Sequence, residues 1–244
     1  MRKVDKNSPI PMYYQLKELI KEMIENEELK PKDPIAPERE LCEYHDVSRM
    51  TVNKAITSLV TEGYLYREQG RGTYVAEPKK NYRVSGLSGL TEEMMVRRGL
   101  KVDTEIISFE EKCPNKTIKS FLELGDGENI YKITRLRRVE KEPYALEVSY
   151  IPAALCPSLS KSKLDNKSLY YVLRTEYGLD MEFANQTIEP IMVDEYESNL
   201  LGIEKNSLAL LFIRRTYTNE GRPFEVTRST YRSDKYKFEI TLKK

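Results

Sequence analysis

The sequence is poor in the features that mark membrane, secreted and metal-binding proteins. Its 244 residues contain no apolar run long enough to cross a bilayer and no charged-then-apolar leader, so we expect a cytoplasmic protein without membrane contact. Three cysteines, Cys42, Cys113 and Cys156, are too few and too scattered for a disulfide framework or a zinc cluster. The single histidine, His45, lies near Cys42 and Asp46, but one turn of ligands without a second cluster is a poor metal site. We therefore expect no metal and no cofactor.

The chain also lacks an excess of charge of one sign. Its net charge is +1, and residues 1–78 hold 12 Lys and Arg against 14 Asp and Glu. This balance excludes a generally basic protein that coats nucleic acid, so any DNA contact must be local. Residues 47–75 hold four basic residues against two acidic ones, while many of the acids fall in residues 12–28. The length is sufficient for two modest domains, each with its own core.

Residues 1–75 are predicted to form three helices followed by a β-hairpin. Apolar residues recur at helical spacing over 12–28, a second short helix follows Pro37, and Ser48 can cap a third helix over 49–62 that Gly63 ends. Strands at 64–68 and 73–75 flank a turn in which Arg71 stands between two glycines. This order predicts a winged helix-turn-helix, whose third helix enters the major groove while Arg71 reaches the minor groove or phosphates. The outward side of that helix is expected to carry Arg49, Asn53, Lys54 and Thr57.

Five short motifs within residues 9–78 resemble the N-terminal domain of the GntR-type bacterial transcription regulators. They are MYYQL from Met12, PEREL from Pro37, VSRMTV from Val47, residues 59–65 and GRGTYV from Gly70. Asn53 stands where many members place arginine, and because Asn prefers adenine edges whereas Arg prefers guanine, the operator is expected to differ from the usual one. Any one of these polar side chains alone could instead be a solvated surface group. The resemblance implies DNA contacts at Arg39, Arg49, Thr51, Asn53, Gly70, Arg71, Gly72 and Thr73.

Residues 76–84 are predicted to be a linker to a second domain over 85–244, because they are polar, include a proline and lack apolar periodicity. Beyond them, strands alternate with helices, so the fold class is expected to be α+β. Residues 135–151 and 212–231 read as two similar hairpins, which suggests a pseudo-twofold sheet with a small-molecule cleft where the halves meet. Strands are predicted at 102–112, 129–139, 144–151, 183–193, 209–218 and 224–231, and helices at 116–124, 168–177 and 194–200.

Four charged residues of this second domain are candidates for ligand binding. Arg135 and Arg137 are two apart on one predicted strand, so their side chains face the same side. Two forks of N–H donors suit a phosphate or a carboxylate. Glu147 and Glu225 are acceptors that could hold sugar hydroxyls. For any one of the four, a surface salt bridge is the alternative.

Residues 86–242 resemble the effector domain, called UTRA, of the HutC-like branch of these regulators, which is related in fold to chorismate lyase. The motifs include RLR from Arg135, ExSYIP from Glu147, SLY from Ser168, FE from Phe224 and YRSDKY from Tyr231. The resemblance implies a mainly antiparallel α/β domain, and it is strongest to repressors of N-acetylglucosamine utilisation, whose effector is an amino-sugar phosphate. It implies that the phosphate meets Leu90, Thr91, Arg135, Arg137, Ser168 and Tyr170, and that the sugar meets Glu147, Glu225 and Tyr231.

Together these features predict a homodimeric regulator that binds double-stranded operator DNA and acts as a repressor released by a phosphorylated sugar such as an amino-sugar 6-phosphate. One alternative is an enzyme acting on a phosphosugar or another anionic metabolite. The sequence offers it no nucleophile–base set, no metal cluster and no glycine-rich phosphate loop, so we expect no enzyme. The other alternative is an activator or architectural DNA binder that needs no ligand.

Overall fold

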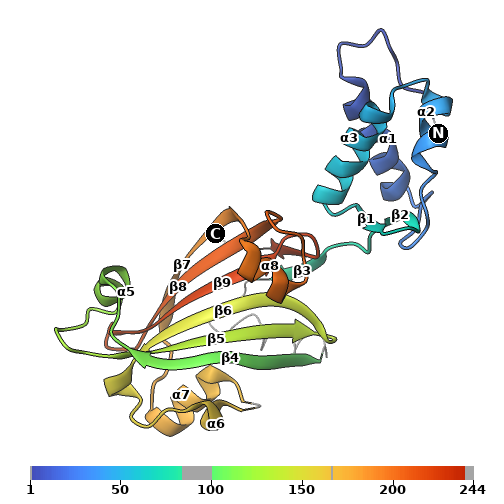
Figure 1. Cartoon of the computed structure of the whole chain (residues 1–244). Coiled ribbons are helices and arrows are strands. Elements are labelled where there is room, and N and C mark those ends of the chain that lie inside the picture. Colours follow the sequence, from blue (N-terminus) through green and yellow to red (C-terminus); the bar gives the residue numbers. More distant parts are fainter. Residues whose placement is uncertain (1, 84–100, 166, 240–244) are drawn as a thin grey trace. The chain divides into compact units, whose positions relative to one another are not determined.

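The computed structural model describes residues 2–83, 101–165 and 167–239, which belong to two compact units (Figure 1). The first unit comprises residues 1–81 with 234–237, and the second comprises 82–233 with 238–244. No helix in these ranges is both long and apolar enough to cross a membrane. Within the same ranges, no group of three or more His, Cys, Asp or Glu side chains is placed to hold a metal ion.

The first unit is a winged helix-turn-helix, as predicted. Its helices are α1 (Met12–Glu25), α2 (Glu38–His45) and α3 (Arg49–Thr61), and its wing consists of the antiparallel strands β1 (Leu65–Glu68) and β2 (Gly72–Val75). The helices bury the apolar stripes that the sequence pattern indicated, and the two strands close the same core. The buried residues of this core are Val4, Leu16, Ile20, Leu41, Val52, Ala55, Ile56, Leu59, Leu65 and Val75.

The first helix is shorter than the predicted range of 12–28. It ends at Glu25, and Asn26 forms its C-terminal cap. Glu27 then takes a left-handed conformation with φ of 60°, and the N–H of Leu29 donates to the carbonyl of Met23 at 3.1 Å. This turn folds Leu29 back against the core, and the buried contact of an apolar side chain outweighs one more turn of helix.

The third helix has the start and the end that the sequence predicted. The hydroxyl of Ser48 accepts from the N–H of Thr51 at 3.1 Å, which satisfies one free donor of the first turn. At the other end, Gly63 is left-handed with φ of 78°, its N–H donates to Val60 and the N–H of Tyr64 donates to Leu59. This pair of bonds is a Schellman motif, and it turns the chain directly from α3 into β1.

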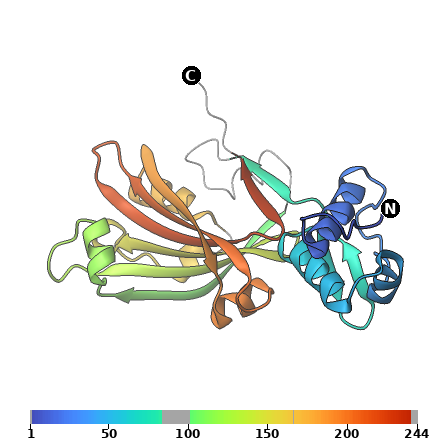
Figure 2. The ribbon, with the colours of Figure 1, turned by 90° about the horizontal axis from the view of Figure 1, so that it is seen from above.

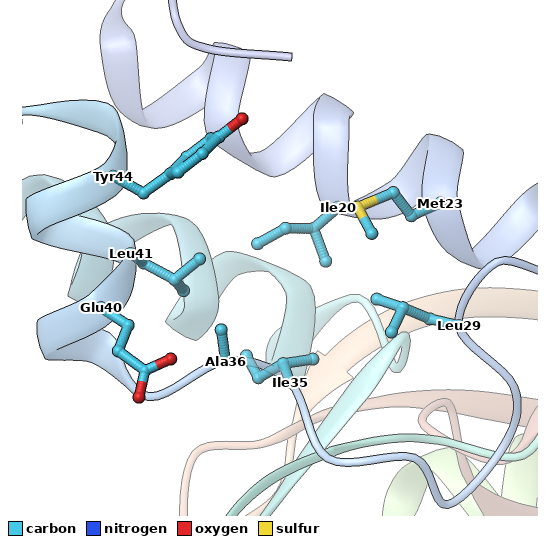
Figure 3. A pocket seen from close by; sticks show the side chains of 8 residues that line it. All are labelled: Ile20, Met23, Leu29, Ile35, Ala36, Glu40, Leu41 and Tyr44. Atoms are coloured by element: carbon cyan, nitrogen blue, oxygen red, sulfur yellow. The ribbon is translucent and has the colours of Figure 1, made fainter. Parts of the chain in front are cut away.

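An apolar pocket of about 430 Å³ lies between α1, α2 and the segment that joins them. Figure 3 shows that its lining comes from all three elements, with the carboxylate of Glu40 as the charged group among apolar side chains. None of the residues predicted to contact DNA lines this pocket. The lining consists of Ile20, Met23, Leu29, Ile35, Ala36, Glu40, Leu41 and Tyr44.

The second unit is built on a six-stranded antiparallel sheet with the order β4-β5-β6-β9-β8-β7 (Figure 1). This order consists of two three-strand meanders whose last strands, β6 and β9, pair in the middle of the sheet. It matches the two similar hairpins of the sequence, which become β5–β6 and β8–β9. The strands are β4 (Val102–Lys112), β5 (Ile130–Val139), β6 (Glu142–Pro152), β7 (Phe183–Met192), β8 (Leu208–Tyr217) and β9 (Pro223–Arg232).

Helices cover both faces of this sheet (Figure 1, and from above in Figure 2). On one face, α7 (Leu169–Tyr177) packs with Ile133 of β5, beside the short α6 (Lys161–Leu164). On the other, α8 (Glu195–Leu201) packs with Leu136, and α5 (Lys116–Phe121) packs with Val226. Because side chains alternate along a strand, Arg135 and Arg137 share the face of Ile133, under α7.

Four short elements were not predicted. They are the 3₁₀-helix Ala153–Leu155, α6, and the strands β3 (Lys80–Arg83) and β10 (Tyr236–Glu239), which pair in a two-stranded sheet. Strand β3 falls inside the predicted linker 76–84. Each of the four has only three or four residues, which is too short for apolar periodicity to reveal it.

Candidate DNA interface and effector site

The outward side of α3 presents the polar residues that the sequence predicted. Arg49, Asn53 and Thr57 are exposed, whereas Val52 and Ile56 between them are fully buried. Thr51 is half-buried, and its hydroxyl lies 2.9 Å from that of Ser48, so it supports the start of the helix. Met50 is 82% exposed and gives the same end of α3 an apolar group, which suits contact with a thymine methyl.

Lys54 is exposed but turns toward α1. Its ammonium group lies 3.9 Å from the centre of the Tyr13 ring, which is a cation–π contact. Lys54 therefore faces outward as predicted, and the ring of Tyr13 holds its ammonium group beside α1.

The tip of the wing needs its two glycines for backbone conformation. Gly70 and Gly72 have φ of 74° and 128°, values that residues with a side chain rarely adopt, and a Cβ on Gly70 would meet nothing within 4 Å. Between them, the N–H of Arg71 donates to the carbonyl of Glu68 at 3.0 Å. The Arg71 side chain is 76% exposed, and its ion pair with Glu68 is a surface pair that contributes little to stability. Its guanidinium is therefore available to a phosphate.

Two further predicted contacts lie nearby in the same unit. Arg39 stands in the first turn of α2, exposed, with Glu43 at 3.6 Å as a surface partner. Thr73 is half-buried on β2, directly opposite Arg67 of β1. The first unit thus brings each of the predicted DNA-contacting residues onto α2, α3 or the wing.

Arg67 was not predicted as part of this surface. Its guanidinium reaches from β1 to the hydroxyl of Thr57 at 3.3 Å and to the carboxylate of Glu38 at 3.6 Å. The position of Arg67 in the sequence could have indicated this. Arg67 is two residues beyond the buried Leu65, so its side chain lies on the side of β1 that faces α3.

The second unit contains a buried cluster of Arg135, Arg137 and Glu147. Arg135 lies opposite Glu147 in the β5–β6 register, and both arginines approach the same carboxylate oxygen, at 3.2 Å and 3.6 Å. The two arginines therefore face the same side, as their spacing predicted. The three side chains are only 8%, 5% and 11% exposed, so the alternative of a surface salt bridge is wrong for all three.

This cluster has more positive than negative charge. Two guanidinium groups share one carboxylate, and within the described ranges the buried Nε of Arg135 has no hydrogen-bond partner. Burial by itself lowers the pKa of Arg137, but Glu147 and then Tyr144 raise it more, so its pKa is raised and the group stays charged. A buried cation without a full partner is costly, so the cluster is suited to accept an anion.

The other proposed acid, Glu225, is fully buried at the centre of a group of hydroxyls. Thr227 donates to one carboxylate oxygen at 2.7 Å, and Thr216 at 3.1 Å and Tyr170 donate to the other. Ser149 bonds to both Arg135 (3.3 Å) and Thr227 (3.1 Å). A continuous polar network therefore joins the two predicted acids across β5, β6, β9 and β8.

Two tyrosines lie at opposite ends of this network, Tyr170 beside Glu225 and Tyr231 toward Glu147. Tyr170 was expected at the phosphate, but the structure places its hydroxyl on Glu225. Tyr231 is buried, with its ring edge against Phe212 at 4.8 Å. Burial, and then Glu225 and Glu147 respectively, raise the pKa of both tyrosines well above the usual range. Both phenols are therefore neutral O–H donors at physiological pH.

A third guanidinium, that of Arg214 on β8, was missed by the sequence analysis. It donates through Nε to Gln186 at 2.8 Å. Burial lowers its pKa, but Tyr170, Tyr231 and Glu225 raise it more, which places it beside the Glu225 end of the network. The similarity of the two hairpins could have revealed Arg214 in the sequence. The two arginines of FIRR in the second hairpin align with Arg137 and Arg138 in the first hairpin.

Three predicted effector contacts remain, namely Ser168, Leu90 and Thr91. Ser168 is exposed and stands at the start of α7 without forming a side-chain capping hydrogen bond there. Leu90 and Thr91 lie outside the described residues.

Comparison with known proteins agrees with both units. Residues 12–75 match the model of bacterial regulatory proteins of the gntR family, and residues 97–237 match the UTRA domain. The HTH-type transcriptional repressor NagR of Bacillus subtilis is 39% identical over 96% of each chain. The mannosyl-D-glycerate transport/metabolism system repressor MngR of Escherichia coli is 33% identical over 94% of this chain and 95% of its own.

Solved structures share the fold. PhnF from Mycobacterium smegmatis superposes with a TM-score of 0.63 over 93% of this chain and 98% of its own, at 24% identity. The gntR family model describes bacterial regulatory proteins, and NagR and MngR are both named as repressors. The chain is thus a DNA-binding transcription regulator that belongs to the GntR family and carries a UTRA domain, in the manner of the HutC-like repressors.

Proposed function

We propose that this regulator is a homodimeric repressor that a phosphorylated sugar, in the first place an amino-sugar 6-phosphate, releases from its operator. In this proposal residues 1–75 bind DNA, residues 76–84 link, and residues 85–244 bind the effector and dimerise. The proposal is supported above all by the buried cluster in which Arg135 and Arg137 share the carboxylate of Glu147, so that among these three side chains two positive charges face one negative charge.

The chemistry of the network favours a sugar phosphate over a simple anion. A phosphate can accept from the forks of Arg135 and Arg137 and from Ser168 at the start of α7, where a helix also presents free N–H groups. Sugar hydroxyls or an amino group would then donate to Glu147 and Glu225 and accept from Tyr231. The Escherichia coli relative is named for a system of mannosyl-D-glycerate, which is itself a sugar with an anionic group.

On the DNA side, the proposal assigns base and phosphate contacts to Arg39, Arg49, Thr51, Asn53 and the wing from Gly70 to Thr73. Two chains would present their α3 helices about one DNA turn, roughly 34 Å, apart on a near-palindromic operator. The effector would favour a dimer in which this separation is wrong. That requires different effector affinities for the two arrangements, and a coupling of about 1–3 kcal/mol is typical.

A direct test measures binding of a selected operator duplex with and without saturating glucosamine 6-phosphate, with unphosphorylated glucosamine as the control. We expect the phosphosugar alone to weaken operator binding by roughly 5- to 150-fold. Sedimentation should give the mass of two chains, and a thermal shift should show that the phosphosugar binds. Equal operator affinity in the presence of bound phosphosugar would contradict the proposal.

A further inference from the structure

A hydrogen-bonded chain runs from the wing to the outward side of α3. The NH2 group of Arg67 donates to the hydroxyl oxygen of Thr57 at 3.3 Å, and that hydroxyl donates to Oδ1 of Asn53 at 3.4 Å. Asn53 and Thr57 are one helical turn apart, and both are exposed. Glu38 pairs with the same nitrogen of the Arg67 guanidinium at 3.6 Å.

The chemistry of these groups gives the chain one direction. Arginine has only donors, so the oxygen of Thr57 must accept from Arg67, and its own proton is left for Asn53. An amide nitrogen does not accept a hydrogen bond, so the atom of Asn53 that faces Thr57 has to be Oδ1. The NH2 group of Asn53 is thereby turned away from Thr57, and the side-chain amide has one defined orientation.

Orientation matters for the base that an asparagine can read. A bidentate contact with adenine needs the amide NH2 at N7 and the amide oxygen at the N6 amino group. Oδ1 of Asn53 keeps a second lone pair for this purpose, because Thr57 uses only one. An exposed amide that no hydrogen bond holds turns between two orientations. Fixing one orientation before binding removes the entropy cost of ordering the amide at the base.

We propose that Arg67 and Thr57 are positioning residues that hold the amide of Asn53 in the orientation that reads adenine. This inference rests on the DNA-binding role proposed above and assigns a wing-strand residue to base specificity rather than to phosphate contact. Specificity at this base pair therefore depends on two side chains that do not touch the base.

The test begins with a pool of duplexes of random sequence, from which the wild-type protein selects its preferred operator. The base pair at which Asn53→Ala loses preference is then varied between A·T and G·C, and both duplexes are titrated by fluorescence anisotropy. We expect the wild type to prefer A·T by roughly tenfold or more. Thr57→Val, which removes the hydroxyl, should reduce that preference to about threefold or less, and Thr57→Ser should keep it.

Thr61→Val is the matched control on the same helix. The hydroxyl of Thr61 is also exposed, but it donates to the backbone carbonyl of Thr57 at 2.9 Å and not to Asn53. Its loss should leave the A·T preference unchanged. Because the readout is a ratio of two affinities for one protein sample, a loss of folded protein cancels from it.

Arg67→Met and Arg67→Lys separate positioning from phosphate contact. We expect Arg67→Met to lose A·T preference as Thr57→Val does, and Arg67→Lys, which can still donate to Thr57, to retain part of it. Weaker binding of both duplexes to an equal degree by Arg67→Met, with a salt slope lower by about one, would instead identify a phosphate contact and overturn the inference. A wild-type preference that survives Thr57→Val would overturn it too. If the wild type selects no sequence at all, the proposed function itself is wrong.

Discussion

Arg135 and Glu147 lie opposite each other in the β5–β6 register, and their charged groups approach to 3.2 Å inside the protein. Arg137 contacts the same carboxylate oxygen from the next position on that face, at 3.6 Å. One acid therefore serves two buried arginines. This arrangement makes the local charge balance of the two arginines depend on Glu147.

Replacing the acid should make the fold depend on added anion. Glu147→Gln leaves two buried guanidinium groups without their carboxylate, which we expect to cost roughly 3–5 kcal/mol. Inorganic phosphate should bind between them and raise the unfolding midpoint of this variant more than that of the wild type, as followed by circular dichroism. The comparison is made at constant ionic strength with chloride.

Glu105→Gln is the control for this prediction. Glu105 pairs with Arg138 in an Arg–Glu contact between β4 and β5, but its side chain is 52% exposed. Its loss should change stability by less than about 1 kcal/mol and leave the phosphate response as in the wild type. Equal phosphate responses in the two variants would show that the buried cluster is not an anion site.

Arg137→Ala should separate effector response from DNA binding. The side chain is buried in the second unit, so operator affinity without effector should stay within about twofold, while glucosamine 6-phosphate should no longer weaken it. Arg138→Ala is the matched control, because Arg138 is the neighbouring arginine but pairs with Asp103 and Glu105 of β4 and not with Glu147. A full effector response in Arg137→Ala would remove this residue from the site.

Arg49→Ala should weaken operator binding by about 1–3 kcal/mol and relax preference at the base that it contacts. Arg174→Ala, which removes an exposed arginine from α7 in the second unit, is the control for charge alone. Titration of operator duplexes with single base changes distinguishes the two effects. A uniform loss across all duplexes would indicate that Arg49 contacts phosphate and not a base.

The stability of the first unit should fall at mildly acidic pH because of His45. Burial, and then Lys3, lower its pKa below the usual 6.5, and Nδ1 accepts from the N–H of Val4 at 3.3 Å. The unfolded chain binds the proton more readily, so stability is complete above about pH 6.5 and is lost as pH falls through that value toward the folded pKa.

This pH dependence is measured by thermal unfolding between about pH 7.5 and 5. His45→Asn keeps an acceptor near the N–H of Val4 but cannot take up a proton in this range. We expect it to remove most of the slope while keeping much of the stability at neutral pH. An unchanged slope would place the titrating group elsewhere.

The first unit could be predicted almost completely from the sequence, because local chemistry decides it. Ser48 and Gly63 mark the two ends of α3 by capping preferences that act within a few residues. The predicted end of α1 was wrong. The left-handed turn at Glu27 is strained, and it is stabilised because it lets Leu29 reach the core. That contact is not visible in the local pattern.

The candidate effector site was predictable only in part. The two-residue spacing of Arg135 and Arg137 indicated a shared face, and the structure agrees. The hydroxyls around Glu225 were not predicted, because threonine is an ordinary strand residue. Only the β6–β9 register brings Ser149 opposite Thr227, and a register between strands so far apart in the chain has no local signal.

The turn at Gly63 limits how the proposed effector could act on DNA binding. Tyr64 bonds back to Leu59 of α3, and β1 begins at the next residue. The recognition helix and the wing are therefore one stiff piece with no slack between them. In the proposed mechanism, release from DNA would displace this piece as a whole, so variants that loosen the turn should bind operator DNA less tightly while the effector still weakens that binding by the same factor.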